Sequence, residues 1–328
     1  MVEISKKILN ILCKPYGIDE SQLNFLGGGR EESEGIVYTY DTTYGERVLK
    51  VLAVPYNKRE SYTAFKERFE YAKFLVEKGV NITYPLLNRK GKLYEFYCED
   101  EYTYIAYSMM FVKGKSPVNM EDLNDELIFE WGRNTGKIHR ISKKFRLWKN
   151  ISSFRYEYGF IDEVNNFYNK CRNKLVREKF IEIFKEISKM PINRDTYGFI
   201  HNDNHENNIL VDNKELTIID FECATGQFFI NDIVSVLQRL MFKECGGMYK
   251  PVSNKKFIEH FLQVFIDGYS KENHIDKIFI ENINTFINYR RLIVYVSMES
   301  YLDRNVKIKN SFLKMIEKPP EVKFDIIM

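Results

Sequence analysis

The polar residues from His201 to Asn208, together with Asp220 a short distance further on, have the types and spacing of a phosphoryl-transfer site. Asp203 is an acid that can accept or orient the proton of a hydroxyl group. Asn208 and Asp220 offer an amide oxygen and a carboxylate, and Mg²⁺ takes such oxygen ligands together with nucleotide phosphates. The sequence therefore predicts a site that transfers a phosphoryl group to a hydroxyl.

Short apolar segments must position these polar residues. Residues 197–200 predict a buried strand, and residues 208–219 predict a β-hairpin. The polar run is then a loop between strands, and such a loop can aim Asp203 at an incoming hydroxyl. Asp220 leaves the second strand of the hairpin and is expected on the same side of the loop.

The run His-Asn-Asp-Asn-His-Glu-Asn-Asn, followed by Ile-Ile-Asp-Phe-Glu, resembles the catalytic and metal-binding loops of the aminoglycoside phosphotransferase and choline kinase superfamily, which is related to the protein kinases. The resemblance implies that Asp203 is the catalytic base and that Asn208 and Asp220 bind Mg²⁺. It also implies that His201 braces the loop and that Glu222 lies near the second metal or the substrate.

Three positions of the loop depart from the usual family pattern. Asn202, Asn204 and Glu206 stand where the family usually has Gly, Leu and Pro. The departures leave the key polar residues intact. They therefore weaken the assignment to a subfamily more than the assignment to the class of enzyme.

A nucleotide-binding segment is expected upstream of the catalytic loop. Residues 25–29, a polar stretch to Gly35, and residues 36–40 predict a strand, a flexible loop and a strand. Gly28 and Gly29 would let backbone N–H groups approach phosphates. A plain hairpin explains the same residues equally well.

A lysine in the next apolar strand is the second candidate for nucleotide binding. Lys50 lies inside the strand predicted at 47–52, and a lysine is unfavourable among apolar residues unless it is paired. The resemblance places Lys50 on the α- and β-phosphates, held by a glutamate of the helix predicted at 57–78. Glu70 is the preferred glutamate by its position, and Glu67, one turn earlier, is the alternative.

The apolar run 104–114 is predicted to be a strand that ends at a glycine. In a two-lobed kinase this segment is the edge strand and hinge, and the backbone groups of Met109, Met110 and Phe111 would face adenine. An ordinary core strand accounts for the hydrophobic residues equally well.

Helical periodicity dominates the chain beyond this strand. Helices are predicted over 121–141, from 231 onward, over 254–269 and over 276–301, and one or two further helices over 161–190. Asp232 resembles a family aspartate that supports the catalytic loop, although a plain helix N-cap also explains it. His139 is expected to be structural, because the sequence shows no acid partner for it.

Together these elements predict an α+β fold of the two-lobed protein-kinase-like type. The N-terminal nucleotide-binding lobe, with a small antiparallel β-sheet, is predicted over 1–108, and the hinge over 109–114. The larger, mostly helical lobe that carries catalysis and substrate binding is predicted over 115–328.

The composition fits a soluble cytoplasmic enzyme. The 49 basic and 46 acidic residues give a net charge of only +3, so nucleic acid is not an expected partner. No apolar run approaches membrane-spanning length, and residues 1–14 lack the features of a signal peptide. The five cysteines are scattered without metal-ligand spacing, so free thiols in a reducing compartment are expected.

The sequence thus predicts a kinase that uses ATP and Mg²⁺ and phosphorylates a hydroxyl of a small molecule. An aminoglycoside, choline or an amino alcohol are the candidate acceptors. Acidic and aromatic residues suited to such acceptors share the segment 154–168, so they do not choose between them.

Two other classes of protein share the kinase fold, a non-catalytic nucleotide-binding protein and a protein kinase. A catalytically weak or inactive nucleotide-binding or scaffold protein with a kinase fold is the alternative. It is less favoured because Lys50, Asp203, Asn208 and Asp220 are all present. A protein kinase is disfavoured because the short connection from Asp220 to the next helix leaves little room for a peptide-docking region.

Overall fold

The computed structural model describes residues 4–29, 35–55, 62–117, 122–145, 159–244 and 255–319. The chain forms two units. The first comprises Met1–Lys115 and Leu210–Glu222, and the second comprises Ser116–Ile209 and Cys223–Met328. The predicted domain boundaries placed Leu210–Glu222 with the second lobe, whereas its contacts group it with the first unit.

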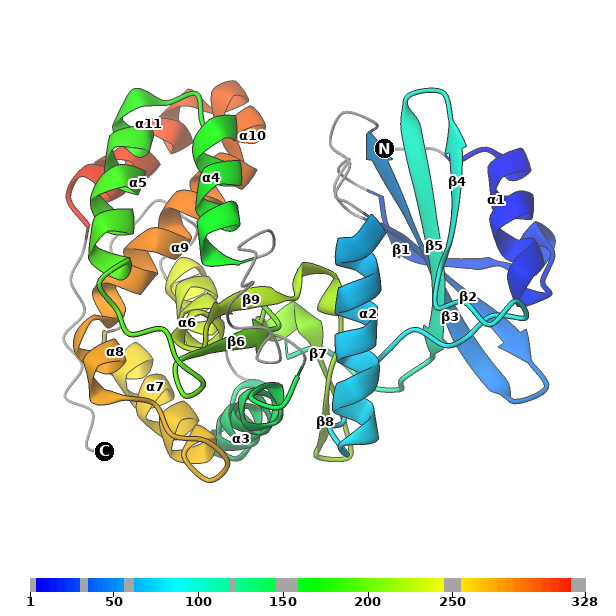
Figure 1. Cartoon of the computed structure of the whole chain (residues 1–328), viewed down its shortest axis with the longest axis horizontal. Coiled ribbons are helices and arrows are strands. Elements are labelled where there is room, and N and C mark those ends of the chain that lie inside the picture. The colour runs from blue at the N-terminus through cyan, green and yellow to red at the C-terminus, as the bar shows by residue number, and fades with distance from the viewer. Residues whose placement is uncertain are drawn as a thin grey trace. The chain divides into compact units, whose positions relative to one another are not determined.

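An antiparallel sheet forms the first unit, and its strand order among the described residues is β1-β2-β3-β5-β4 (Figure 1). The strands are β1 Asn24–Gly28, β2 Ile36–Thr42, β3 Gly45–Pro55, β4 Glu95–Glu99 and β5 Tyr102–Met110. Because β5 pairs with both β3 and β4, the prediction that it is an edge strand is wrong. The edge of the sheet next to β5 is β4, a short strand with charged ends that the sequence pattern did not reveal.

One face of this sheet packs on helix α1, Lys6–Cys13. Ile8 and Leu12 of the helix join Leu49 and Val51 of β3 in one buried cluster. Leu49 and Val51 are two residues apart, as expected for side chains that share a face of a strand. The amphipathic N-terminal segment is therefore part of the core.

The opposite face packs on helix α2, Tyr62–Glu77, and Figure 1 shows α1 and α2 on opposite sides of the sheet. Phe65 and Phe69 of α2 form a second buried cluster with Leu52 of β3. Strand alternation places the buried side chain of Lys50 on this same face. The sheet thus presents Lys50 beside α2 and away from α1.

A small hairpin also belongs to the first unit. Its strands are β7 Ile209–Asp212 and β8 Glu215–Ile218. The backbone of Ile218 is tied to the segment before β4, since it donates to Asn81 O at 3.3 Å and accepts from Thr83 N at 3.1 Å. These bonds fix the chain just before Asp220.

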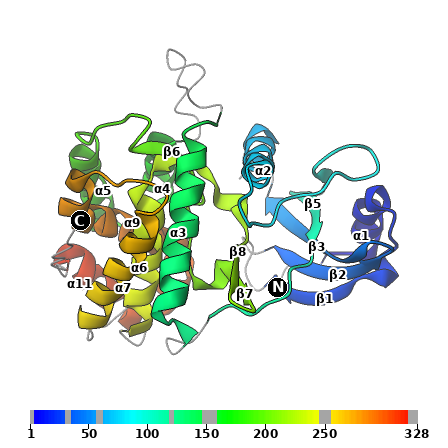
Figure 2. The same cartoon turned by 90° about the horizontal axis from the view of Figure 1, so that it is seen from below.

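Helices make up most of the second unit, together with two short antiparallel strands (Figure 2). The described elements are α3 Asp125–Ser142, α4 Phe160–Lys170, α5 Lys174–Ile187, β6 Tyr197–Ile200, β9 Thr225–Phe228, α6 Ile230–Glu244, α7 Lys255–Tyr269, α8 Lys277–Glu281, α9 Ile283–Ser297, α10 Glu299–Arg304 and α11 Val306–Glu317. The segment 161–190, predicted to form one or two helices, forms two, whereas the helix predicted over 276–301 is three helices. In the described part of the chain, no helix has the length and hydropathy needed to cross a membrane.

Helices α3 and α7 lie side by side and approach closely at glycines (Figure 2). A Cβ atom on Gly132 of α3 would lie 2.0 Å from the carbonyl oxygen of Phe265. A Cβ on Gly268 of α7 would lie 2.0 Å from the carbonyl oxygen of Phe129. The absence of a side chain at both positions allows the two backbones to touch.

Candidate active site

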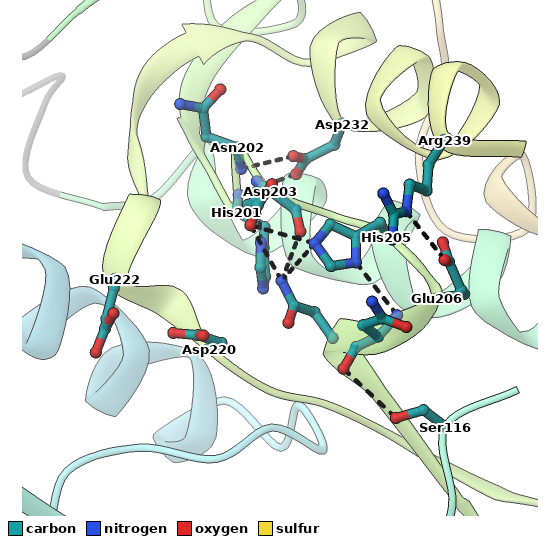
Figure 3. A network of polar contacts seen from close by, with 12 residues as sticks. Ser116, His201, Asn202, Asp203, His205, Glu206, Asp220, Glu222, Asp232 and Arg239 are labelled. Carbon is teal, nitrogen blue, oxygen red and sulfur yellow. Dashed lines mark hydrogen bonds and ion pairs between the residues drawn. The ribbon is translucent and has the colours of Figure 1, made fainter. Parts of the chain in front are cut away.

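The loop that follows β6 is held at its start by Asp232, in the first turn of α6. The Asp232 carboxylate accepts hydrogen bonds from the backbone N–H of His201 at 2.9 Å and of Asn202 at 2.7 Å (Figure 3). It also lies 3.0 Å from Nε2 of His139 in α3. The expectation that His139 has no acid partner is therefore wrong, because the partner lies 93 residues away in the chain.

The charge of Asp232 is stabilised by these same contacts. Burial opposes ionisation, but the hydrogen bond and charge of His139, together with His201, hold the pKa of Asp232 below its ordinary value. A carboxylate that stays ionised keeps accepting from both backbone N–H groups. This geometry fits the supporting role expected for Asp232.

Asn202 replaces the usual glycine of the motif in a backbone conformation that asparagine tolerates. Its φ is +65°, in the left-handed region where glycine is favoured and asparagine is enriched. Its side chain donates to Glu163 of α4 at 2.7 Å, and Glu163 also accepts from Gln227 and from the hydroxyl of Tyr289. Glu163, which the sequence offered as an acid for the acceptor, is instead engaged in bracing the loop.

Asn204 and Glu206, the other two residues that differ from the family pattern, also have hydrogen-bond partners. Asn204 is buried, accepts from Nε1 of Trp131 at 2.8 Å and donates to Oγ1 of Thr135 at 3.1 Å. Glu206 is buried and accepts from Nε of Arg239 at 3.1 Å. Each unusual residue of the loop thus has a matching residue on a neighbouring helix.

Three side chains contact the carboxylate of Asp203. Nη2 of Arg290 lies 3.1 Å from Oδ1. Nε2 of His205 and Nδ2 of Asn208 each lie 3.3 Å from Oδ2, and Figure 3 shows His205 beside Asp203. Burial favours the protonated acid, but the hydrogen bond and charge of His205 and the charge of Arg290 hold the pKa of Asp203 well below its usual range. Asp203 is therefore ionised at neutral pH and suited to orienting a hydroxyl.

Neither His205 nor Arg290 was singled out from the sequence. His205 stands inside the motif, so its position two residues from Asp203 was an available signal. Arg290 carried no such signal, because it lies 87 residues from Asp203 in an ordinary helical pattern. Arg290 becomes a site residue only through the packing of α9.

The side-chain amide of Asn208 differs in its contacts at nitrogen and at oxygen. Its Nδ2 donates to the backbone oxygen of Asp203 at 2.9 Å in addition to the Asp203 side chain. Among the described residues, no donor contacts the Asn208 amide oxygen. That oxygen fits a hard cation such as Mg²⁺.

In the first unit, Lys50 is paired with two acids that follow β8. Its Nζ lies 2.9 Å from Oδ2 of Asp220 and 3.0 Å from Oε2 of Glu222, and the hydroxyl of Tyr107 donates to Glu222. Burial by itself would lower the pKa of Lys50, but the carboxylates of Glu222 and Asp220 outweigh it and raise that pKa above its ordinary value. Burial and the charge of Asp220 raise the pKa of Glu222.

Asp220 also fits the predicted metal-binding role. Its Oδ1 is buried and has no hydrogen-bond donor within the described part of the chain. Its φ of +68° is unusual for a residue other than glycine and turns the chain away from β8. A buried carboxylate oxygen without a donor is costly unless a cation or another donor meets it.

The predicted partner of Lys50 is not among its observed ion pairs. Among the described residues, Lys50 pairs with Asp220 and Glu222, while Glu70 lies 4.0 Å from Nζ of Lys66. The pairing of Lys50 with Glu70 therefore stays a prediction, as does the alternative with Glu67.

The glycines and the predicted hinge lie at the ends of strands β1 and β5. Gly28 and Gly29 have φ of +87° and +73°, and a Cβ on Gly28 would lie 1.9 Å from the carbonyl oxygen of Gly35. Met109 and Met110 end β5, and the backbone N–H of Phe111 donates to Glu46 O at 3.2 Å. That N–H is engaged within the protein, and the contact of this segment with adenine stays a prediction.

The fold is that of a kinase-like phosphotransferase. Residues 27–271 match the model of the phosphotransferase enzyme family, APH, and the chain belongs to that family. The chain is 27% identical over 311 residues to amicoumacin kinase of Bacillus subtilis (strain 168). The aligned region covers 92% of this chain and 86% of that protein. The prediction of a phosphotransferase with an alcohol group as acceptor is confirmed.

Solved structures establish the same fold. The amicoumacin kinase hAmiN, in complex with AMP-PNP, Ca²⁺ and Ami, aligns with a TM-score of 0.80 at 23% identity over 97% of this chain and 94% of that one. A microcompartment-associated aminopropanol kinase aligns with a TM-score of 0.70 at 13% identity over 96% and 97% of the two chains. The predicted two-lobed, protein-kinase-like α+β fold is confirmed.

Proposed function

We propose that this phosphotransferase transfers the γ-phosphoryl group of ATP to a hydroxyl of a small organic molecule, with Asp203 orienting that hydroxyl. The observation that carries the proposal is the Asp203 carboxylate itself. Its surroundings lower its pKa, and nitrogen atoms of Arg290, His205 and Asn208 lie against its two oxygens. A positioned acid of this kind is what transfer to a hydroxyl requires.

In the proposed reaction, a bond forms between the acceptor oxygen and the γ-phosphorus while the bond from that phosphorus to ADP breaks. Asp203 orients the hydroxyl and accepts its proton as the new bond forms. Because the lowered pKa makes Asp203 a weak base, its main contribution is orientation, as expected for a loose transition state.

The nucleotide side of the site is proposed to use Lys50 and the two oxygens that lack donors. Lys50 carries the positive charge that suits the α- and β-phosphates, and Asn208 and Asp220 would hold Mg²⁺. The bound ion would neutralise charge on the phosphates. The further residues proposed to serve nucleotide binding are Gly28, Gly29, Glu70, Met109, Met110 and Phe111.

The acceptor is proposed to be a small hydroxylated molecule of the amicoumacin, aminoglycoside or amino-alcohol kind. The relatives that support this range are named for amicoumacin and aminopropanol. A cytoplasmic location, where ATP is available, is part of the proposal.

Release of ADP from Mg-ATP across a panel of acceptors tests the function. The panel contains amicoumacin, aminoglycosides, 1-amino-2-propanol, choline and homoserine, with Asp203→Asn as the blank. We expect one class of acceptor to stimulate ADP release, and Asp203→Asn to lower that turnover by at least about 100-fold. Nucleotide affinity, measured by calorimetry, should be retained in the variant.

Two results would count against the proposal. Full turnover in Asp203→Asn would remove the assigned role of Asp203. Tight nucleotide binding without stimulation by any acceptor would favour the alternative of a kinase-fold nucleotide-binding or scaffold protein.

A further inference from the structure

We propose that Arg290 is a positioning residue for phosphoryl transfer, and that it directs the accepting hydroxyl to Oδ1 of Asp203. The proposal rests on the proposed function, because it assumes that Asp203 orients the acceptor. Arg290 lies in α9, far from the catalytic motif in sequence, and the proposal adds it to the residues that position the acceptor.

The hydrogen bonds of Asp203 single out one free position on the carboxylate. An ionised carboxylate offers about four lone-pair positions, two on each oxygen. The two on Oδ2 face Nε2 of His205 and Nδ2 of Asn208, and one on Oδ1 faces Nη2 of Arg290. The remaining position is on Oδ1, so a hydroxyl that donates to Asp203 does so beside the Arg290 guanidinium.

Nε2 of His205 lies 3.3 Å from Oδ2 of Asp203 and also 3.3 Å from Nδ2 of Asn208. Nδ1 of His205 accepts a hydrogen bond from the backbone N–H of Asn207 at 3.2 Å, which places the ring proton on Nε2. With its proton on Nε2, His205 presents a donor to Oδ2 of Asp203 at 3.3 Å. This assignment leaves Oδ1 as the atom for the acceptor.

The residue that precedes Arg290 in α9 is anchored to the same loop. The preceding residue, Tyr289, is buried and donates to Glu163, and Glu163 accepts from the side chain of Asn202. Helix α9 thus reaches two consecutive residues of the loop, Asn202 through Glu163 and Asp203 through Arg290. The anchoring of Tyr289 fixes the helix beside Arg290, and the ion pair with Arg290 then favours one orientation of the Asp203 carboxylate.

The ion pair is also more enclosed than an ordinary surface pair. The side chain of Arg290 is 13% exposed and that of Asp203 is 36% exposed. A charge-assisted hydrogen bond between partly buried groups is stronger and more directional than one at the surface. Removing Arg290 is therefore expected to let the Asp203 carboxylate rotate, with Oδ2 still bound and Oδ1 displaced.

The test compares Arg290→Gln, Arg290→Lys, Asp203→Asn and the double variant Asp203→Asn/Arg290→Gln. Turnover is measured as ADP release with the acceptor found in the panel and also with water as acceptor. Arg290→Gln should lower kcat by about 10- to 100-fold, since small displacements of a reacting group cost that much. Arg290→Lys keeps the charge but not the planar fork and should retain an intermediate kcat.

Because Arg290 acts through Asp203, the double variant should be no slower than Asp203→Asn alone. Nucleotide affinity and the melting temperature of Arg290→Gln should stay near those of wild type. Arg140→Gln is the matched control, because Arg140 is half exposed and pairs with Glu272 on the surface of the same unit. If Arg290→Gln does not fold, kcat is compared instead between Arg290→Lys and the double variant Asp203→Asn/Arg290→Lys.

Wild-type kcat in Arg290→Gln would overturn the proposal, and so would losses that multiply in the double variant, because a merely structural arginine would act independently of Asp203. The two proposals fail in different ways. An active Asp203→Asn removes the proposed function, whereas an inactive Asp203→Asn beside a fully active Arg290→Gln removes only the role of Arg290.

Discussion

Nε2 of His139 lies 3.0 Å from Oδ2 of Asp232, and both side chains are buried. Nδ1 of the same ring lies 2.9 Å from the hydroxyl of Tyr269, and the ring stacks on Phe229 with centroids 4.6 Å apart. Since Asp232 also accepts from the backbone of His201, one buried chain of polar contacts joins α3, α6 and α7 to the start of the catalytic loop.

Asp232→Asn is expected to lower the free energy of unfolding by about 3 kcal/mol at pH 7, because it weakens a buried pair and its backbone contacts. The pKa of Asp232 is lower in the folded protein, so its charge stabilises the fold above the unfolded value of about 3.9. That stability is lost as pH falls through the lower, folded pKa.

The difference between wild type and Asp232→Asn should therefore shrink below about pH 4, as measured by urea unfolding at several pH values. Asp195→Asn is the control, because Asp195 pairs with Lys143 at the surface and its loss should change stability by less than about 0.5 kcal/mol. A difference for Asp232→Asn that is the same at pH 7 and pH 3 would contradict the ionised assignment.

Lys50→Met is expected to abolish turnover and to destabilise the protein by about 3 kcal/mol, because Asp220 and Glu222 lose their shared cation. Adding Glu222→Gln should restore part of the stability without restoring turnover. Chemical denaturation and ADP release measure the two effects. Lys92→Met, which removes an exposed lysine of the same unit, should change neither, and equal effects of the two lysine variants would count against the prediction.

Asn204→Leu introduces the usual family residue and is expected to cost about 2 kcal/mol of stability. The substitution leaves the buried Nε1 of Trp131 without its acceptor and Thr135 without its donor. In the double variant with Trp131→Phe, the loss should be smaller than the sum by about 1 kcal/mol, because one unsatisfied group is gone. Strictly additive losses in urea unfolding would argue against this coupling.

Gly132→Ala is expected to destabilise the second unit by about 3 kcal/mol, because the added methyl group would overlap the Phe265 carbonyl oxygen. Gly27→Ala is the matched control. A Cβ at Gly27 meets no atom within 4 Å, so a change of less than about 0.5 kcal/mol is expected. Thermal and urea unfolding of both variants provide the measurement, and a tolerated Gly132→Ala would show that α3 and α7 can separate at little cost.

Local patterns in the sequence predicted most of the helices and strands, and the misses have physical reasons. The apolar run at 47–52 correctly predicted a buried strand that carries a lysine, since such a run is a local property of the sequence. Strands β4 and β9 were not predicted from the sequence, because strands of 5 and 4 residues are too short to show a periodic pattern. Such strands form because a neighbouring strand supplies their hydrogen bonds.

The sequence by itself determined the class of enzyme and the position of the catalytic loop, because the motif residues lie within a few positions of one another between apolar strands. Only the tertiary structure decided which side chains surround them. Arg290 reaches Asp203 across 87 residues, His139 reaches Asp232 across 93, and Lys50 reaches Asp220 across 170. Such pairs depend on how distant helices and strands pack, and no spacing along the chain encodes that packing.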